Sequence, residues 1–481
     1  MQKKIILAFL IILNFAAFAS ASEIYETIGK GDNQITVLYL KGSPYQMGYI
    51  QGSTFPAEIA ELYNTALQVA SQYASLTLLD IAYNQMEPFI PQAYKDEMQG
   101  LADGAGVDIK TVHRLHAVPD LSELDCTFFA AWGSATKDGQ LYQIRALDYA
   151  KELLLQKYPA ILVYEPEDGR RFVNVSWLGF IGVVTGMNYD GIMVSEIGDS
   201  FDKANQSLAG EPMPFVLRDV LQYSDNLDDA VKMIEQATRT SSYLFCVGDA
   251  KIPDARSIKA GRTVFEVYTD QTNPNTVIKE MVYFSMGITS SWNTKVYQFL
   301  KPRYGQIDVY TGIELMQQLG TGDLHAISYD PTHNRLFVAN AGMDQSNAFD
   351  RDFVEFDLSR ADTVFANYAV TAVESKGHTA PHRFSLAQNY PNPFNSETKI
   401  EIDFPAGQHN ASPANRNIKL VIYDMQGRNV RTLSPASQYA GHYTFRWNGR
   451  DDQQLPVPSG LYLYTFSAGN ASQTKKMILI K

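Results

Sequence analysis

The spacing of apolar residues changes at Cys126, and this change constrains the fold more than any other feature of the chain. Residues 44–73 and 91–123 have the apolar spacing of amphipathic helices, after one strand pattern at 35–40. From residue 127 onward, short segments alternate apolar and polar residues as strands do, with helical stretches between them. Antiparallel hairpins with helices in blocks predict an α+β fold rather than a parallel, doubly wound sheet.

The C-terminal part has a different pattern. Residues 374–383 are polar, contain Gly and Pro, and lack periodicity, which is typical of a linker. Residues 384–481 contain short alternating segments bounded by Gly, Asn, Asp or Pro. Such segments predict short antiparallel strands and a small all-β, Ig-like sandwich.

The first 21 residues have the features of a signal peptide. Lys3 and Lys4 precede an apolar run, and small residues at 19–21 form a cleavage site. We therefore expect export through the periplasm and a secreted or cell-surface protein. No later segment has about 18 uninterrupted apolar residues, so no membrane span is expected in the mature form. The net charge of −12 provides no basic excess for binding nucleic acid.

Cys126 and Cys246 are the two cysteines of the chain. Exported proteins often contain disulfides, but Cys246 lies in the apolar run "SYLFCVGD", which is typical of a buried strand. A strand also follows Cys126, so the helix-opening cysteine of a papain-like protease is disfavoured. Cleavage before Cys126 would instead free an α-amine with a pKa of roughly 7.7–8.0, which can serve as the base for its own thiol. In this interpretation the Asp125–Cys126 bond is cleaved by the chain itself through an N-to-S acyl shift.

Arg145 and Asp148 belong to the strand that is expected to return past Cys126. A guanidinium there would lower the pKa of the thiol, and a carboxylate would orient the new amine through a charge-assisted hydrogen bond. The alternative is a surface ion pair without a catalytic role.

The C-terminal segments resemble a known sorting domain. "QNYPNPFN" (388–395), "YDMQGRNVRTL", "SGLYLY" and "KKMILIK" are similar to the C-terminal sorting domain of type IX secretion substrates. The resemblance covers nearly all of residues 384–481. It implies that the type IX secretion machinery is a partner at the outer membrane, with an ordinary Ig-like accessory module as the alternative.

The segments around Cys126 carry a second resemblance. "LKGSPYQMGYIQG", "GLADGAGVDIKTV", "DCTFFAAWGSATKDGQLYQIRALDY", "GMNYDGIMVSE" and "LHAISYDPTHNRLFVANA" resemble the C45-type autoproteolytic acyltransferases and hydrolases of the N-terminal nucleophile superfamily. This resemblance implies a four-layer αββα fold over residues 22–373, divided into a pro-segment (22–125) and a β segment (126–373). It also implies Cys126 as the nucleophile, without a cofactor or a metal.

The same resemblance assigns partners to Cys126. Arg145 and Asp148 match the Arg-x-x-Asp pair that flanks the nucleophile in this superfamily. Glu196 lies where the acid ceramidase type carries a glutamate, with an edge-strand carboxylate as the alternative. Asn188 is either a turn residue or a residue that lines the site.

The oxyanion donor departs from the family pattern. The family usually has an asparagine near the start of the strand that here contains "TSSYLFCVGD", where this chain offers Ser241, Ser242 or Tyr243. A missing donor of this kind typically costs about 3 kcal/mol in the transition state. The departure therefore weakens the prediction of efficient hydrolysis.

The histidines do not predict a metal site. His113 and His116 are three residues apart, but no third ligand follows at metal spacing. His325 is interpreted as structural.

The main hypothesis is an exported, self-cleaving cysteine hydrolase or acyltransferase. It would attack a small-molecule carboxamide or ester and pass through a thioester at Cys126. Phe128, Phe129 and Trp132 alternate as a strand would and belong in part to the core, while aromatic residues near Cys126 could also line an acyl pocket. Two alternatives stay open: a non-catalytic surface or binding protein on a decayed hydrolase fold, and a papain-like protease that uses a histidine such as His325.

Overall fold

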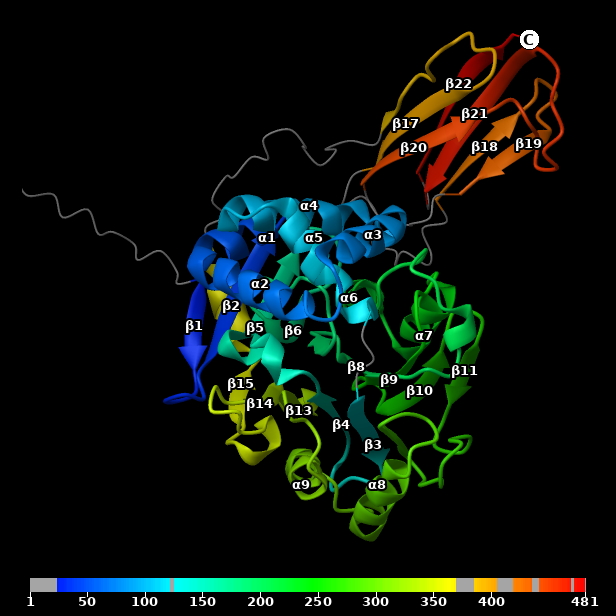
Figure 1. Cartoon of the computed structure of the whole chain (residues 1–481). Helices are drawn as coiled ribbons and strands as arrows, with labels where there is room; N and C mark the ends of the chain where they lie inside the picture. Colours follow the sequence, from blue (N-terminus) through cyan, green and yellow to red (C-terminus); the bar gives the residue numbers. More distant parts are fainter. Residues whose placement is uncertain are drawn as a thin grey trace, which may run out of the picture.

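The protein is described here by a computed structural model that covers residues 24–121, 125–368, 385–404, 418–434, 441–468 and 471–480. The predicted signal peptide (1–21) and linker (374–383) lie outside these residues. Helices and sheets are mixed up to residue 368, and strands alone follow from residue 385 (Figure 1). The predicted α+β composition with an all-β C-terminal part is therefore confirmed. Within the described ranges, every helix is too short or too polar to cross a membrane.

The larger sheet of the N-terminal part has nine strands in the order β1-β2-β5-β6-β7-β8-β9-β10-β11. β2 and β5 pair in parallel, and the other neighbours are antiparallel. The strands are β1 (Tyr25–Ile28), β2 (Ile35–Gly42), β5 (Pro159–Pro166), β6 (Phe172–Trp177), β7 (Gly186–Asn188), β8 (Ile192–Gly198), β9 (Tyr243–Asp249), β10 (Asp254–Ala260) and β11 (Phe265–Tyr268).

The smaller sheet has six antiparallel strands in the order β12-β3-β4-β13-β14-β15. The strands are β3 (Asp125–Gly133), β4 (Gly139–Asp148), β12 (Met281–Ser285), β13 (His325–Asp330), β14 (Arg335–Asn340) and β15 (Val354–Asp357).

The two sheets face each other, since β3 contacts β8, β9 and β10 of the larger sheet. One face of β3 contributes Cys126 and Phe128 to the main hydrophobic core between the sheets. The opposite face contributes Phe129 and Ala131 to a second cluster on the other side of the smaller sheet. This is the two-residue alternation that the sequence predicts for residues 127–136.

Helices cover the outer sides of both sheets. On the larger sheet α1 contacts β2, α6 contacts β7 and β8, and α7 contacts β9 and β10, whereas α8 and α9 contact β12, β4 and β13 of the smaller sheet. Figure 1 shows α1–α5 together at one end of this part and α8 and α9 at the opposite end. These contacts are compatible with the predicted αββα order. The helices are α1 (Pro44–Thr54), α2 (Pro56–Ala70), α3 (Leu76–Met86), α4 (Gln92–Ala105), α5 (Ile109–Ala117), α6 (Met213–Tyr223), α7 (Leu227–Gln236), α8 (Trp292–Leu300), α9 (Val309–Leu319) and α10 (Arg360–Ala366).

Helix α1 begins at a capping box. The Ser43 hydroxyl accepts a hydrogen bond from the Gln46 N–H (3.4 Å), and Gln46 Oε1 accepts one from the Ser43 N–H (2.9 Å). Pro44 occupies the first helical position, where no N–H is needed. The Gly-Ser-Pro segment at residues 42–44 therefore starts this helix.

Helices α1 and α4 approach so closely that glycine is required at the crossing. A Cβ at Gly48 would lie 2.0 Å from the Glu97 carbonyl oxygen, and one at Gly100 would lie 2.1 Å from that of Tyr45. No side chain fits at such distances. The crossing carries two polar residues, Gln51 and Glu97, into the core, where both are fully buried.

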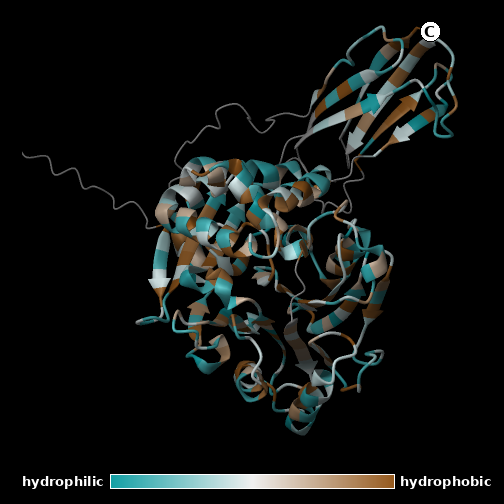
Figure 2. Cartoon of the chain, viewed as in Figure 1, coloured by the Kyte–Doolittle hydropathy of each residue, from teal (hydrophilic) through white to brown (hydrophobic). Residues whose placement is uncertain are grey.

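The C-terminal part forms two sheets, with the strand orders β16-β17-β20 and β19-β18-β21-β22. They enclose their own core, which includes Trp447, Tyr464 and Phe466. Apolar (brown) and polar (teal) segments alternate along these strands in Figure 2. The strands are β16 (Ser385–Leu386), β17 (Thr398–Phe404), β18 (Lys419–Tyr423), β19 (Asn429–Leu433), β20 (Gly441–Trp447), β21 (Gly460–Ala468) and β22 (Ala471–Leu479).

Candidate active site

Three side chains form a row across the smaller sheet. Cys126 of β3 lies opposite Leu147 of β4, and Leu147 lies opposite His325 of β13. Directly paired residues point to the same face of a sheet, so all three face the larger sheet. Cys126 is fully buried, and Cys126 and Cys246 are both free thiols.

Arg145 lies on the same face as Cys126, because it is two residues before Leu147 on β4. It forms an ion pair with Glu196 of β8 in the facing sheet, and both side chains are fully buried. Arg145 Nε and Nη1 and Glu196 Oε2 have no hydrogen-bond partner among the described residues. Buried polar atoms are normally paired, so these three atoms are available to a bound group.

Burial dominates the ionisation of Cys126. It raises the pKa of the thiol well above its usual value, while the positive charge of Arg145 opposes the increase and Glu196 and Asp148 add to it. The uncut chain therefore holds Cys126 as a neutral thiol at neutral pH. A thiolate would need a base close to the sulfur.

Asp148 lies at the end of β4, opposite Asp125 in the β3–β4 pairing. Its carboxylate accepts hydrogen bonds from Thr321 Oγ1 (2.7 Å) and from the N–H groups of Gly322 (2.7 Å) and Asp323 (2.9 Å). Burial raises the pKa of this carboxyl, and the three donors oppose the increase. The carboxylate is thus held in one orientation, and strand alternation places it with Thr127 on the face of the smaller sheet opposite Cys126, at the strand position paired with Asp125.

A hydroxyl network that sequence analysis missed extends from Asp148. Thr127 Oγ1 is 2.9 Å from Thr321 Oγ1 and 2.7 Å from Ser285 Oγ. Of these three hydroxyls, only that of Thr127 could have been predicted from the sequence, because Thr127 directly follows Cys126. The other two hydroxyls come from distant parts of the chain and meet it through tertiary packing.

Asn188 is a turn residue rather than a residue that lines the site. Its Oδ1 accepts from the N–H groups of Asp190 (3.0 Å) and Ile192 (2.9 Å), and its Nδ2 donates to the Leu221 carbonyl (3.1 Å). These backbone contacts occupy the side chain. Of the two roles considered for Asn188, the structure supports the turn.

Tyr243 is the first residue of β9, and Ser242 directly precedes this strand. Tyr243 pairs with Gly198, two residues from Glu196, and so lies on the face that carries Glu196. Its hydroxyl is 3.5 Å from the Pro119 carbonyl oxygen. The buried hydroxyl of Ser242 has no hydrogen-bond partner among the described residues. The expectation that Ser242 lines the site stays a prediction, whereas Tyr243 lies at its edge.

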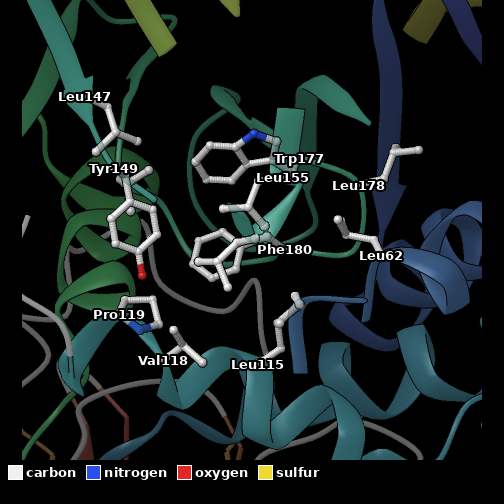
Figure 3. A pocket seen from close by; sticks show the side chains of 13 residues that line it. Leu62, Leu115, Val118, Pro119, Leu147, Tyr149, Leu155, Trp177, Leu178 and Phe180 are labelled. Atoms are coloured by element: carbon white, nitrogen blue, oxygen red, sulfur yellow. The ribbon is translucent and has the colours of Figure 1, made fainter. Parts of the chain in front are cut away.

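An apolar pocket adjoins the row at Leu147 (Figure 3). The space within its walls, open solvent at the mouth included, is about 670 Å³. Its lining residues come from segments before and after Cys126 in the sequence. The lining residues are Leu62, Ala66, Leu115, Val118, Pro119, Leu147, Tyr149, Leu153, Leu155, Trp177, Leu178, Phe180 and Val184.

The aromatic residues of this pocket differ from those suggested by the sequence. Tyr149, Trp177 and Phe180 line it, whereas Phe128 packs in the core between the sheets and Phe129 on the opposite face of β3. A second cavity shares Val118, Tyr149 and Leu153 with the pocket and reaches Tyr73 and Leu121 at the surface.

His325 is neutral and does not pair with Cys126. Its Nε2 lies 3.1 Å from Thr185 Oγ1, and burial, assisted by Arg145, holds its pKa well below the usual value. Leu147 separates it from Cys126 in the row by two strand spacings, about 10 Å. This arrangement does not provide the cysteine–histidine contact of a papain-like protease. Among the residues that the structure describes, no cluster of His, Cys, Asp or Glu side chains could hold a metal ion.

Comparisons with known proteins support the class that the site suggests. Residues 134–276 match the family model of the acyl-coenzyme A:6-aminopenicillanic acid acyl-transferases. The matched segment begins after Cys126 and contains Arg145, Asp148 and Glu196. Residues 399–472 match the FlgD Ig-like domain. These matches support an N-terminal nucleophile hydrolase or acyltransferase part followed by an Ig-like domain.

Individual relatives are similar to this chain over different shares of its length. The chain is 28% identical to Protein dcd1A of Dictyostelium discoideum over 383 residues, 69% of this chain and 87% of the relative. It is 24% identical to the N-acylethanolamine-hydrolyzing acid amidase of Mus musculus over 173 residues, 34% of this chain and 46% of that protein. The chain thus matches about half the length of the mouse amidase.

Two solved structures show weaker likeness. The Caenorhabditis elegans ortholog of the same amidase has a TM-score of 0.36 at 19% identity, over 43% of this chain and 93% of that one. A mutant of the conjugated bile acid hydrolase of Clostridium perfringens has a TM-score of 0.32 at 9% identity, over 48% of this chain and 96% of that one. These scores are too low to carry an argument about function.

Proposed function

We propose that this chain is an exported cysteine hydrolase or acyltransferase that cleaves itself before Cys126 and then acts on an amide or ester with an apolar acyl group. The observation that carries the proposal is the row on β3, β4 and β13. Cys126 is paired with Leu147, which lines the apolar pocket, and Arg145 lies on the same face and forms an ion pair with Glu196 of the facing sheet.

The first reaction in this proposal is cleavage of the chain. The Cys126 thiol attacks the carbonyl carbon of Asp125, and the peptide C–N bond breaks as the acyl group moves from nitrogen to sulfur. Water then hydrolyses this thioester, which leaves a carboxylate on Asp125 and returns the thiol and a free α-amine to Cys126. Asp148 lies opposite Asp125 in the strand pairing, where its carboxylate would orient that amine.

The second reaction uses the new amine as the base. The amine takes the thiol proton, and the thiolate attacks the acyl carbonyl of the substrate to form a thioester. The proton passes to the leaving amine or alcohol, and water or an acceptor amine resolves the thioester. The unpaired N–H groups of Arg145 are the donors that this geometry offers to the oxyanion in place of the family's asparagine.

The proposal includes export and sorting. Residues 1–21 would direct the first step, and the Ig-like part at 384–481 would be recognised by the type IX secretion machinery. The hydrolase part would then extend over residues 22–373. The motifs quoted above from the C-terminal segments support this part of the proposal.

Intact-mass measurement of the full-length protein tests the proposal. We expect wild type to separate into two pieces, the second starting at Cys126, and to release amine from N-acyl amides. We expect Cys126→Ala to remain uncut and inactive. Cleavage of the Cys126→Ala chain at the same bond, or amide hydrolysis by an uncut wild-type chain, would contradict it.

A further inference from the structure

One wall of the apolar pocket is a buried, irregular loop, residues 178–185, which connects β6 to β7 and is called the pocket loop below. Its side chains Leu178, Phe180 and Val184 line the pocket, and Figure 3 shows the first two. Loops usually lie at the surface, because a buried backbone without regular structure leaves polar groups unpaired. The pocket loop therefore needs other groups to satisfy its backbone.

Five buried side chains provide these groups. They form hydrogen bonds with backbone groups of Gly179, Ile181 and Gly182. Three of the five side chains belong to residues that precede Cys126 in the sequence. The hydrogen bonds are Gly179 N–H to Gln51 Oε1 (2.5 Å), Tyr63 Oη–H to the Gly179 carbonyl (2.5 Å), Ile181 N–H to His116 Nε2 (3.1 Å), Arg218 Nη1–H to the Ile181 carbonyl (2.7 Å) and Asn174 Nδ2–H to the Gly182 carbonyl (2.9 Å).

His116 is the one aromatic base in this set, and its partners fix its tautomer. Nδ1 is 2.8 Å from the Val112 carbonyl oxygen, and Nε2 is 3.1 Å from the Ile181 nitrogen. A carbonyl can only accept and an amide N–H can only donate, so Nδ1 carries the proton and Nε2 the lone pair. His116 is therefore a neutral imidazole with both nitrogens used.

The ring of His116 also supports a pocket side chain. It stacks on Phe180 with centroids 5.0 Å apart and an interplanar angle of 8°, and it lies parallel to Phe215 at 6.2 Å. The charged and titratable groups that act on it are Arg218 and His113, and both disfavour a positive charge on the ring. One buried side chain thus holds both the backbone and the aromatic ring of the pocket wall.

We propose that His116 is a positioning residue that sets which acyl groups the pocket accepts. Its Nε2 fixes the Ile181 N–H, and its ring fixes Phe180, so the pocket wall keeps one shape. Without the acceptor, the buried Ile181 N–H is unpaired and the loop moves to find another partner. This inference rests on the proposed function, because it assigns the pocket to the acyl group.

Two substitutions separate the two contacts. His116→Gln can place an amide oxygen near the position of Nε2 and removes the ring. His116→Phe keeps a flat ring against Phe180 and removes the acceptor. His113→Phe is the matched control, since His113 is on the same helix but stacks on Tyr83, outside the pocket loop.

The test uses the full-length, self-cleaved protein and N-acyl amides of 7-amino-4-methylcoumarin with acyl chains of about 4 to 16 carbons. We expect His116→Phe to raise KM for the preferred chain about tenfold, the order expected for a buried unpaired donor, with kcat changed less than about twofold. We expect the chain-length preference to flatten. His116→Gln should restore part of the preference, and His113→Phe should match wild type. An unchanged KM and chain-length profile in His116→Phe, or a loss confined to kcat, would overturn the inference.

A binding measurement distinguishes failure of this inference from failure of the proposed function. Cys126→Ala protein with or without His116→Phe is titrated with cis-parinaric acid, a fluorescent fatty acid. We expect about tenfold weaker binding when His116 is replaced, even if no amide is ever hydrolysed. Equal affinities would overturn the role of His116. If His116→Phe does not fold, the same comparison is made with His116→Gln, for which we expect weaker binding because the ring against Phe180 is lost.

Discussion

Two arginine–glutamate pairs are buried in the same part of the molecule, yet their surroundings differ. Arg218 and Glu97 are joined at 2.6 Å, and a second nitrogen of Arg218 donates to the pocket loop. The rings of Tyr94 and Tyr164 each lie 4.6 Å from the Arg218 guanidinium carbon. This guanidinium is thus held by a carboxylate, a carbonyl and two aromatic faces.

The other pair, Arg145 and Glu196, lies beside Cys126 and has fewer contacts. Two nitrogens of Arg145 and one oxygen of Glu196 lack a partner among the described residues, against one nitrogen of Arg218 and one oxygen of Glu97. A buried ion pair is costly to desolvate, so it persists where further contacts offset the cost or where function requires it. The same two residue types thus form a structural pair at Arg218 and Glu97 and, beside Cys126, a pair for which we propose a role in the reaction.

The largest effect is expected from breaking the ion pair of Arg218 and Glu97, called the framework pair below. Arg218→Met leaves Glu97 buried without its partner and removes the donor to the Ile181 carbonyl. We expect the free energy of unfolding to fall by about 3–5 kcal/mol, measured by urea denaturation at neutral pH.

The control for this prediction is a part-exposed pair. Arg114 and Asp80 are 2.6 Å apart, with side-chain exposures of 21% and 34%. Arg114→Met should lower the free energy of unfolding by no more than about 1 kcal/mol. Equal losses in the two variants would show that Arg218 is not a framework residue.

The second effect concerns activity. Replacing both members of the reactive pair, by Arg145→Met with Glu196→Leu, leaves no unpaired charge, so the free energy of unfolding should stay within about 1 kcal/mol of wild type or rise. Cleavage before Cys126 and amide hydrolysis should slow by about 10²–10³-fold, because the guanidinium beside the thiol and the oxyanion is lost. The rates come from intact-mass time courses and from amine release.

The matching double replacement sharpens the comparison. Arg218→Met with Glu97→Leu also removes both charges, but the Ile181 carbonyl still loses its donor. This variant should therefore be less stable than the Arg145→Met, Glu196→Leu protein. If the two double variants were equally stable and equally active, the distinction between the pairs would be wrong.

Sequence periodicity predicted the local part of the site. The two-residue alternation of β4 places Arg145 and Leu147 on one face, and the short β3–β4 hairpin brings that face beside Cys126. The hairpin also sets Asp148 opposite Asp125. Both relations depend on neighbouring strands, whose register follows from the turn between them. Their catalytic roles stay predictions.

The distant part of the site could not be predicted in this way. Thr321 reaches Asp148, and His116 reaches Ile181, because separate helices and loops pack on the two sheets. No periodicity in the sequence encodes which loop a helix will meet. The pocket walls, which come from both sides of Cys126, depend on the same long-range packing. Glu196 was anticipated through a family resemblance rather than from its own strand pattern.

The smallest expected effect is a pH dependence of the unfolding free energy that arises from His116, which binds the same pocket loop as Arg218. Burial lowers the pKa of His116 to about 4, against an unperturbed value of about 6.5. The folded state therefore favours neutral His116, and its contribution is complete above pH 6.5 and lost as the pH falls toward 4. Between pH 7.5 and pH 5, wild type should lose about 2 kcal/mol more unfolding free energy than His116→Phe, which has no imidazole to protonate. Urea denaturation of both proteins at each pH gives this difference directly. Because His113 and the buried carboxyls are present in both proteins, they cancel in the comparison, and parallel pH curves would show that His116 is not held neutral at Ile181.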